Sequence, residues 1–136
     1  MRTETKIGIV VREDLATWQK LNVTAFLAGG LAGGVEGLTG QPYVDGGGTE
    51  YTPMISQPVL VYTGEGGALT RVRDRATARS LTVGIYTEEL FATNNDIDNR
   101  AAVVAVDTEK LQLVGVSVYG PRNQVSAALK GLALHG

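Results

Sequence analysis

The chain has 136 residues, a formal net charge of −2, and hydrophobic and charged fractions of 43% and 19%, values typical of one globular domain that spans residues 1–136. The absence of cysteine excludes disulfides, thiolate nucleophiles and cysteine-based zinc or iron–sulfur sites. A Ser-His-Asp mechanism would require the single histidine, His135, to fold back from the C-terminal tail, so we expect this residue to be solvated. The slight acidity disfavours broad contact with a nucleic-acid backbone, although a local basic patch would still permit it.

No stretch of about 18 apolar residues, the minimum for a membrane span, occurs in the sequence. The first residues are polar and lead directly into a strand, unlike the apolar core of a signal peptide. We therefore expect a soluble, cytoplasmic domain with no membrane contact.

A buried central strand is predicted for residues 7–11, because this β-branched run lacks polar alternation and suits a strand covered on both faces. Three charged residues, 12–14, follow where the chain leaves the sheet, and residues 15–21 form a connection. Asn22 is predicted to cap a helix that extends to Gly34. Apolar residues at i, i+3, i+4, i+7 and i+8 define its buried face: Val23, Phe26, Leu27, Gly30 and Leu31.

Glycine is frequent in the second half of this helix, at positions 29, 30, 33 and 34. Each of these glycines costs about 1 kcal/mol relative to alanine. A close backbone contact with a strand or a second helix would compensate for that cost, and this is the interpretation that we favour. The alternative is a frayed helix end.

Residues 35–53 have the composition of a loop, with Gly46–Gly48 between two tyrosines. Loops of this length are often functional or disordered, so we expect either a mobile flap or, as we prefer, a plain solvent loop. A strand over residues 57–63 then enters a glycine-rich turn at residues 64–67. That turn could cradle an anion, although the dinucleotide fingerprint lacks its third glycine at Leu69.

A helix is predicted for residues 68–79, with Leu69, Val72 and Ala76 on its buried side. Three arginines recur at i+4 steps along another side, at positions 71, 75 and 79. They could contact phosphates or an acidic partner, but a solvated helix face is the more common reason for such spacing.

A third strand is predicted for residues 81–87, and residues 90–100 then form a connection crowded with amides and carboxylates. We favour a turn capped by Asx hydrogen bonds over a cation site at Asp96 and Asp98. Residues 101–106 either continue this connection or form a short strand.

The last predicted strand covers residues 111–119, and Gly120 and Pro121 end it and begin a helix. The core positions of that helix are Val125, Ala128, Leu129 and Leu132. Strands that alternate with helices in this way predict an α/β sandwich, with helices on both faces of a mostly parallel or mixed sheet.

Three stretches carry a resemblance to a known family: VVREDLATWQKLNVTAFLAGG, LTVGIYTEELFATNNDIDNRAA and LVGVSVYGP. They are similar, over nearly the whole chain, to the domain-of-unknown-function family 2000 (DUF2000), a fold-level relative of the type II peptidyl-tRNA hydrolases. Those enzymes share a VVR-x-DL strand end, matched here by Val10 to Leu15, and a Gly-Pro after a late strand, matched by Gly120 and Pro121. The resemblance implies a three-layer α/β/α fold with a four-stranded mixed sheet, often dimeric.

The chain departs from those hydrolases at their catalytic positions. When the sequences are aligned on Val23, Asn22 stands in place of their lysine and Phe26 in place of their glutamine. Gly29 replaces their histidine, and Glu88 falls near their third-strand aspartate. The resemblance therefore implies the hydrolase fold without its catalytic Lys/Gln/His pattern.

We favour a domain that binds a small polar or nucleotide-type ligand beyond the carboxyl ends of the first and third strands, where open α/β sheets bind ligands. The residues expected to bind it are Arg12, Asp14, Trp18, Asn22, Thr93, Asn94, Asp96 and Arg100. A more ordinary interpretation makes Arg12 and Asp14 a structural ion pair and Trp18 a lid on the core.

Two alternatives remain open. The first is a hydrolase of an ester or amide, in which Lys20 and Glu88 form the catalytic polar pair and Thr24 positions the substrate. The second is a homodimeric interaction module built on the glycine-bearing helix or on the arginines of the second helix. We expect neither a cofactor nor a metal ion in any of these roles.

Overall fold

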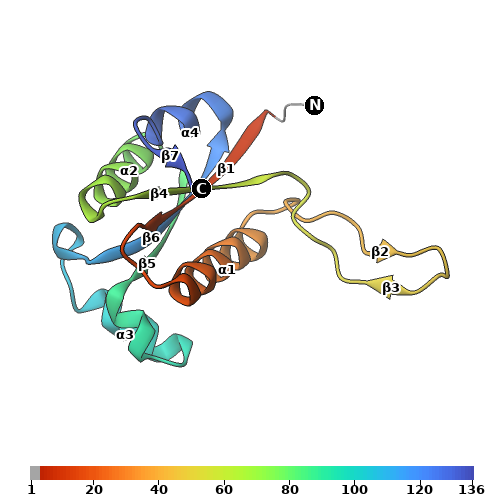
Figure 1. The fold of residues 1–136 in the computed structure, drawn as a ribbon, viewed down its shortest axis with the longest axis horizontal. Coiled ribbons are helices and arrows are strands. Elements are labelled where there is room, and N and C mark those ends of the chain that lie inside the picture. The colour runs from red at the N-terminus through yellow and green to blue at the C-terminus, as the bar shows by residue number, and fades with distance from the viewer. Residues whose placement is uncertain (1–3) are drawn as a thin grey trace.

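Within residues 4–136, which the computed structural model describes, a five-stranded mixed sheet forms the centre of the domain in the order β5-β6-β1-β4-β7 (Figure 1). Its strands are β1 (Thr5–Arg12), β4 (Val59–Gly64), β5 (Thr82–Thr87), β6 (Leu113–Pro121) and β7 (Ala133–Leu134). β1 is parallel to β4 and antiparallel to β6, and β6 is antiparallel to β5. The strands β1, β4 and β5 therefore all end at the same edge of the sheet.

Helices cover both faces of the sheet, which gives three layers (Figure 1). One face carries α1 (Thr17–Gly34), and the other carries α2 (Gly66–Ala78) and α4 (Arg122–Ala128). The end of β5 leads into the 3-10 helix η1 (Glu88–Ala92) and then α3 (Asp96–Val104), and a second 3-10 turn, η2 (Thr108–Lys110), precedes β6. The predicted α/β fold with a mixed sheet is confirmed.

The prediction of a four-stranded sheet is wrong, because the end of the chain adds a short fifth strand. β7 pairs antiparallel with Tyr62 and Thr63 of β4, and the backbone N–H of His135 donates to the carbonyl of Val61 at 2.9 Å. A strand of two residues has no periodicity that sequence analysis could detect. This pairing also folds the tail back over the sheet, although His135 itself stays exposed.

Two hydrophobic cores form because the residues of β1 point alternately to opposite faces of the sheet. On the α1 face, Ile7, Ile9 and Val11 are at most 1% exposed. They pack there with Val23, Leu27 and Leu31 of α1. On the other face, Val10 of β1 packs with Leu69, Val72 and Val125 of α2 and α4. The predicted central position of the opening strand is therefore confirmed.

The helix α1 packs closely on β6 because Gly115 has no side chain. A Cβ atom at this position would lie 2.3 Å from Cγ1 of Val23 and 3.0 Å from Cδ1 of Leu27. The glycines of α1 itself make no such approach: outside the helix backbone, a Cβ at position 29, 30, 33 or 34 would meet no described atom within 4 Å. The predicted close contact at the helix glycines is therefore wrong, and a strand glycine provides the close approach instead.

Replacing Gly33 by alanine should stabilise the domain. The added methyl group meets no described neighbour, and alanine is favoured over glycine in a helix interior by about 1 kcal/mol. Urea denaturation should therefore show a gain in the free energy of unfolding of up to about 1 kcal/mol. A clear loss of stability would contradict this expectation and would indicate that the exposed face of α1 is covered in solution.

The helix α1 begins earlier than predicted. Its N-cap is Ala16, whose backbone N–H donates to Oε1 of Gln19 at 2.9 Å. Asn22 therefore lies inside the helix, and its predicted capping role is wrong because the first helical residue is Thr17. Phe26, which was predicted on the buried face, is 58% exposed. The buried side of α1 is the narrower one formed by the core residues described above.

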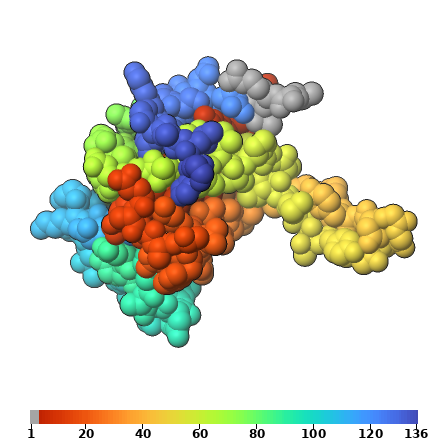
Figure 2. All heavy atoms as spheres, viewed as in Figure 1, coloured from red at the N-terminus to blue at the C-terminus, as the bar shows by residue number. Residues whose placement is uncertain are grey.

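Residues 39–54 form a hairpin that projects from the body of the domain, and we call it the arm (Figures 1 and 2). It contains β2 (Tyr43–Val44) and β3 (Glu50–Tyr51), and every residue of the arm is exposed. The preferred prediction of a solvent loop is thus right about exposure but misses the strand pairing. At the tip, the Tyr51 hydroxyl donates to Oδ2 of Asp45 at 2.7 Å. This bond lowers the pKa of Asp45 and raises the pKa of Tyr51.

The connection after β5 contains a helix, not only a capped turn. The predicted Asx hydrogen bond is present, since Oδ1 of Asn95 accepts the backbone N–H of Asp98 at 2.8 Å, but it caps the start of α3. Of residues 101–106, which were left open between a strand and a connection, 101–104 are the second half of this helix, and 105–106 belong to the turn that follows it.

Candidate functional site

Arg12 joins the ends of β1 and β5 at their shared edge of the sheet. Its Nε lies 2.6 Å from Oδ1 of Asp14, and its Nη2 lies 3.1 Å from Oε1 of Glu88. Partial burial of the guanidinium opposes its charge, but the bonds to both carboxylates outweigh burial and raise the pKa of Arg12. The hydrogen bond from Arg12 is also the main cause of a lowered pKa at Asp14. The polar residues beyond the two strands therefore meet, as expected, but they neutralise one another.

The glycine-rich turn before α2 borders a small acidic hollow of about 170 Å³. Its lining contains the carboxylates of Glu13, Asp14 and Glu65, together with Arg12 and Gly66. Arg12 is already paired, so a phosphate placed at this helix N-terminus would meet mainly like charges. The arrangement does not favour the anion site considered for this turn.

A larger hollow, which we call the α1–α3 cleft, lies between α1 and the segment that follows β5. Its volume is about 410 Å³. Trp18, Asn22 and Phe26 line one wall, since residues at i, i+4 and i+8 share one side of a helix. The rest of the lining is Tyr86, Leu90, Phe91, Thr93, Asn94, Asn95, Asp96 and Asn99. Five of the residues predicted to bind a ligand, Trp18, Asn22, Thr93, Asn94 and Asp96, thus lie together.

Four aromatic rings form a connected cluster in the cleft. The ring centroids of Trp18 and Phe91 are 5.8 Å apart, those of Phe91 and Tyr86 are 5.2 Å apart, and those of Tyr86 and Phe26 are 5.9 Å apart. Tyr86 is buried, whereas Trp18 and Phe26 are 61% and 58% exposed. The inner rings support the outer two, which leaves much of the surface of Trp18 and Phe26 available to a ligand. Trp18 also packs edge-on against Phe91, which contacts the core, so its role as a lid on the core stays a prediction beside the binding role.

The hydrogen-bonding groups of the cleft are mostly neutral. Nδ2 of Asn22 donates to the Tyr86 hydroxyl at 3.3 Å. Burial raises the pKa of Tyr86, and this bond opposes the rise only in part, so the phenol stays protonated. The Thr93 hydroxyl donates to Oδ1 of Asn99 on α3 and bridges the two segments that form the outer wall.

Arg100 differs from the other predicted binding residues because it does not line the cleft. Its Nε donates to Oδ2 of Asp96 at 2.7 Å, and this bond raises the pKa of Arg100. The side chain of Arg100 is 79% exposed. Asp96, the one acidic residue in the lining, therefore has its charge balanced from outside the cleft.

The cleft continues over the edge strand β5 as a hollow of about 330 Å³. The two hollows share Phe26, Tyr86, Leu90, Asp96 and Asn99. Gly84 lies in the lining of the second hollow, and a Cβ there would come within 2.4 Å of Oγ of Ser117. The strand glycine thus lets Ser117 of β6 reach the lining as a polar group.

The three residues predicted for catalysis have separate partners. Nζ of Lys20 lies 3.2 Å from Nε2 of His135, and the Thr24 hydroxyl donates to the carbonyl of Lys20 at 2.8 Å. Glu88 pairs with Arg12 at the sheet edge. Within residues 4–136, no hydrogen bond or ion pair joins Lys20 or Thr24 to Glu88. Their catalytic role stays a prediction.

Comparison with known proteins places the chain in a family. The profile of a family described as "Protein of unknown function (DUF2000)" matches residues 5–136. The chain belongs to the DUF2000 family. The DUF2000 domain is also similar to a solved structure, that of the protein of unknown function Atu0240 from Agrobacterium tumefaciens strain C58, with 38% identity and a TM-score of 0.94. That match covers 99% of this chain and 100% of the other. Among curated proteins, no match was found.

Sequence analysis of the DUF2000 domain missed Phe26 and Tyr86 in the lining of the α1–α3 cleft, and it missed the contact of His135 with Lys20. Phe26 was assigned to the core, although its i+8 spacing from Trp18 would have placed it beside the binding residues. Tyr86 carried no signal because it lies inside a predicted strand, next to the last residue of β5. His135 carried none either, because only the pairing of β7 with β4 brings it to Lys20.

Two kinds of site are absent from the described part of the DUF2000 domain. Among residues 4–136, no three His, Cys, Asp or Glu side chains gather closely enough to hold a metal ion. In the same range, no helix is both long and apolar enough to cross a membrane.

Proposed function

We propose that this DUF2000 domain binds a small, neutral, planar ligand of the nucleobase or nucleoside kind in the α1–α3 cleft. The observation that carries the proposal is the pairing of two exposed aromatic rings, Trp18 and Phe26, with a wall of side-chain amides in a cavity of about 410 Å³. Small-molecule sites typically combine apolar and aromatic walls with a few polar groups that fix orientation.

The chemistry of the lining favours a heterocycle over an apolar ring. An asparagine side chain presents one carbonyl acceptor and two N–H donors, which matches the mixed donor and acceptor edge of a nucleobase. Asn94 and Asn99 line the cleft and can supply these groups, whereas the amide of Asn95 is already bonded to Asn94 and Asp98. Stacking of a base on an aromatic side chain contributes about 1–3 kcal/mol.

The charge of the lining favours a nucleoside over a nucleotide. Lysine and arginine are missing from the described lining, and its acidic residue, Asp96, would repel a phosphate that lay close to it. The nearest guanidinium, that of Arg100, is already bonded to Asp96. The ribose of a bound nucleoside would extend toward the hollow over β5, where the exposed Thr82 offers a hydroxyl group.

Trp18 provides a direct test because it is the single tryptophan of the chain. Titration with adenosine, guanosine, cytidine or uridine should change its fluorescence in a saturable way for at least one of them. Phe26→Ala should weaken that binding by about tenfold or more, since it removes one stacking surface. Ile97→Ala, an 80% exposed apolar residue of α3 outside the lining, is the matched control and should bind normally.

Two outcomes would end the proposal. The first is unchanged Trp18 fluorescence with all four nucleosides at millimolar concentration. The second is binding that is equally strong in wild type and Phe26→Ala, because such a ligand must lie elsewhere. Thermal denaturation of both variants checks that neither substitution unfolds the domain.

A further inference from the structure

The arm leaves an unusual amount of apolar surface without contacts. Four large side chains on it are at least half exposed: Tyr43 at 50%, Val44 at 62%, Tyr51 at 53% and Met54 at 57%. A two-stranded hairpin is marginally stable by itself in water. Figure 2 shows the arm standing clear of the body, so within one chain nothing covers these side chains.

The arm is nevertheless firmly attached and locally ordered. At its base, the N–H of Gly40 donates to the carbonyl of Met54 at 3.0 Å, and Leu38 is only 3% exposed in the α1 core. At its tip, the carboxylate of Asp45 accepts the hydroxyl of Tyr51 and the backbone N–H of Thr49. Such a segment presents its side chains in a fixed arrangement, which suits it to a defined surface.

A complementary surface exists on the body of the same chain. Leu21, Ala25 and Gly29 lie at i, i+4 and i+8 on the exposed side of α1, and Leu21 is 67% exposed. Leu21 and Ala25 also line a groove of about 460 Å³, together with Val11 and Val61 and with four polar residues: Thr17, Thr24 and the contacting pair Lys20 and His135. The small residues would allow another backbone to approach closely.

We propose that the arm of one DUF2000 chain lies along α1 and the adjoining groove of a second copy. Charge favours this occupant: the arm carries Asp45 and Glu50 with no basic residue, whereas α1 carries Lys20 with no acidic residue. Lengths agree as well, since about nine residues from the base to the tip of the arm span roughly 30 Å, and the 18 residues of α1 span about 27 Å.

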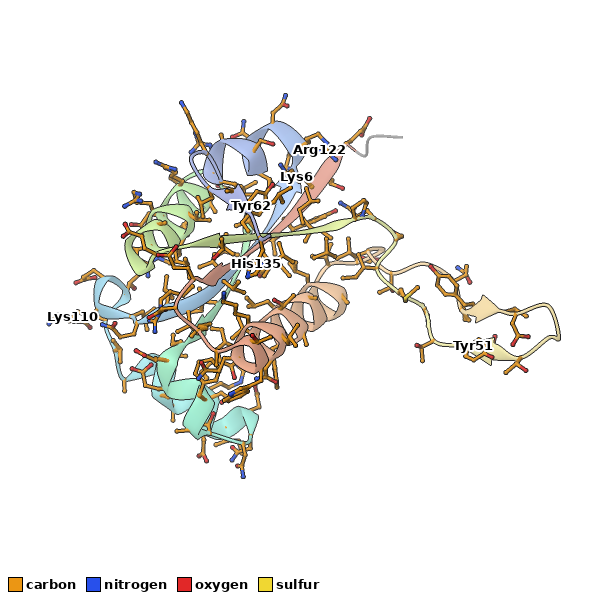
Figure 3. All side chains as sticks on the ribbon, in the orientation of Figure 1. Lys6, Tyr51, Tyr62, Lys110, Arg122 and His135 are labelled. Carbon is orange, nitrogen blue, oxygen red and sulfur yellow. The ribbon has the colours of Figure 1, made fainter. Side chains whose placement is uncertain are left out.

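Connectivity makes the exchange reciprocal. Residue 35 directly follows the end of α1, so the base of the arm lies beside that end of the helix (Figure 1). In a two-fold arrangement with antiparallel α1 helices, each arm would run over the helix of the other copy. Figure 3 shows Tyr51 far out on the arm and His135 on the body, so the arm does not reach the groove of its own chain.

The lack of cysteine in the wild type makes a selective cross-linking test possible. Tyr51→Cys protein mixed with Ala25→Cys protein and oxidised should give a disulfide-linked dimer of the two variants. In the control mixture, Tyr51→Cys with Arg79→Cys should give background cross-linking only, because Arg79 follows α2 on the other face of the sheet.

Sedimentation analysis tests the interface without cross-linking. Wild type should dimerise, and Tyr43→Asp on the arm or Gly29→Glu on α1 should each weaken dimerisation by about tenfold or more, with circular dichroism showing that both variants are folded. A wild type that is monomeric at all accessible concentrations would overturn the inference. So would a dimer that both variants leave intact. The groove and the α1–α3 cleft share no lining residue, so neither result bears on nucleoside binding.

Discussion

Gly115→Ala is expected to be among the most destabilising single methyl additions in this domain. The new Cβ would stand 2.3 Å from Cγ1 of Val23 and 3.0 Å from Cδ1 of Leu27, far inside van der Waals contact. Val23 is fully buried and Leu27 is 6% exposed, so neither can move aside freely. Overpacking of this kind costs about 1–3 kcal/mol, and urea denaturation should show a loss near the upper end of that range.

A double-mutant cycle separates this clash from other effects of the substitution. Val23→Ala removes Cγ1 and should by itself cost about 2 kcal/mol through the cavity that it leaves. The double variant should lose clearly less stability than the sum of the two single losses, because the added methyl fills part of that cavity. Additive losses would show that the contact between α1 and β6 is not the cause. Gly33→Ala, the same substitution at a position where the new Cβ meets no described atom, should instead increase the free energy of unfolding.

Arg73→Ala is expected to cost about 2–3 kcal/mol, because it removes a buried side chain together with its charge-assisted hydrogen bond to a backbone carbonyl. Arg73 is 7% exposed, and its Nη1 donates to the carbonyl of Thr108 at 2.8 Å, which fastens η2 to α2. A second bond joins its Nε to Oδ1 of Asp74 at 3.0 Å. Equilibrium urea denaturation measures the loss, and hydrogen exchange should show faster opening of residues 107–112.

Arg71→Ala is the matched control on the same helix. Its guanidinium lies 4.0 Å from Glu65, and both side chains are more than half exposed. Exposed pairs of this kind contribute little, so the change in the free energy of unfolding should stay within about 0.5 kcal/mol. Equal losses in the two variants would contradict the structural role assigned to Arg73.

The main sheet and its helices were predictable because their residues are periodic. Residues 7–11, 57–63, 81–87 and 111–119 lie on the four long strands to within a few residues. For the arginines of the second helix, only their regular spacing could be predicted from the sequence. Arg71, Arg75 and Arg79 form the regular pattern, whereas the buried arginine is Arg73, which lies outside that pattern. Burial of Arg73 depends on η2, which is far away in sequence and has no pattern of its own.

The candidate site was predictable in part. The polar residues after the first and third strands do lie at one edge, because parallel strands end together. They separate into an ion-pair cluster around Arg12 and the α1–α3 cleft, since the early start of α1 carries Trp18 and Asn22 away from Arg12. A helix start satisfied by Gln19 instead of by a preferred capping residue leaves little trace in a sequence.

The pairing of β1 with β6 determines how late in synthesis the sheet can be completed. β1 ends at Arg12 and leaves the ribosome well before its antiparallel neighbour, which begins only at Leu113. At about 5–20 residues per second, the wait is on the order of ten seconds. Until β6 is made, β1 can pair with β4 but not with its second neighbour in the sheet. Nascent chains of this domain should therefore be good clients for chaperones that hold extended, apolar segments.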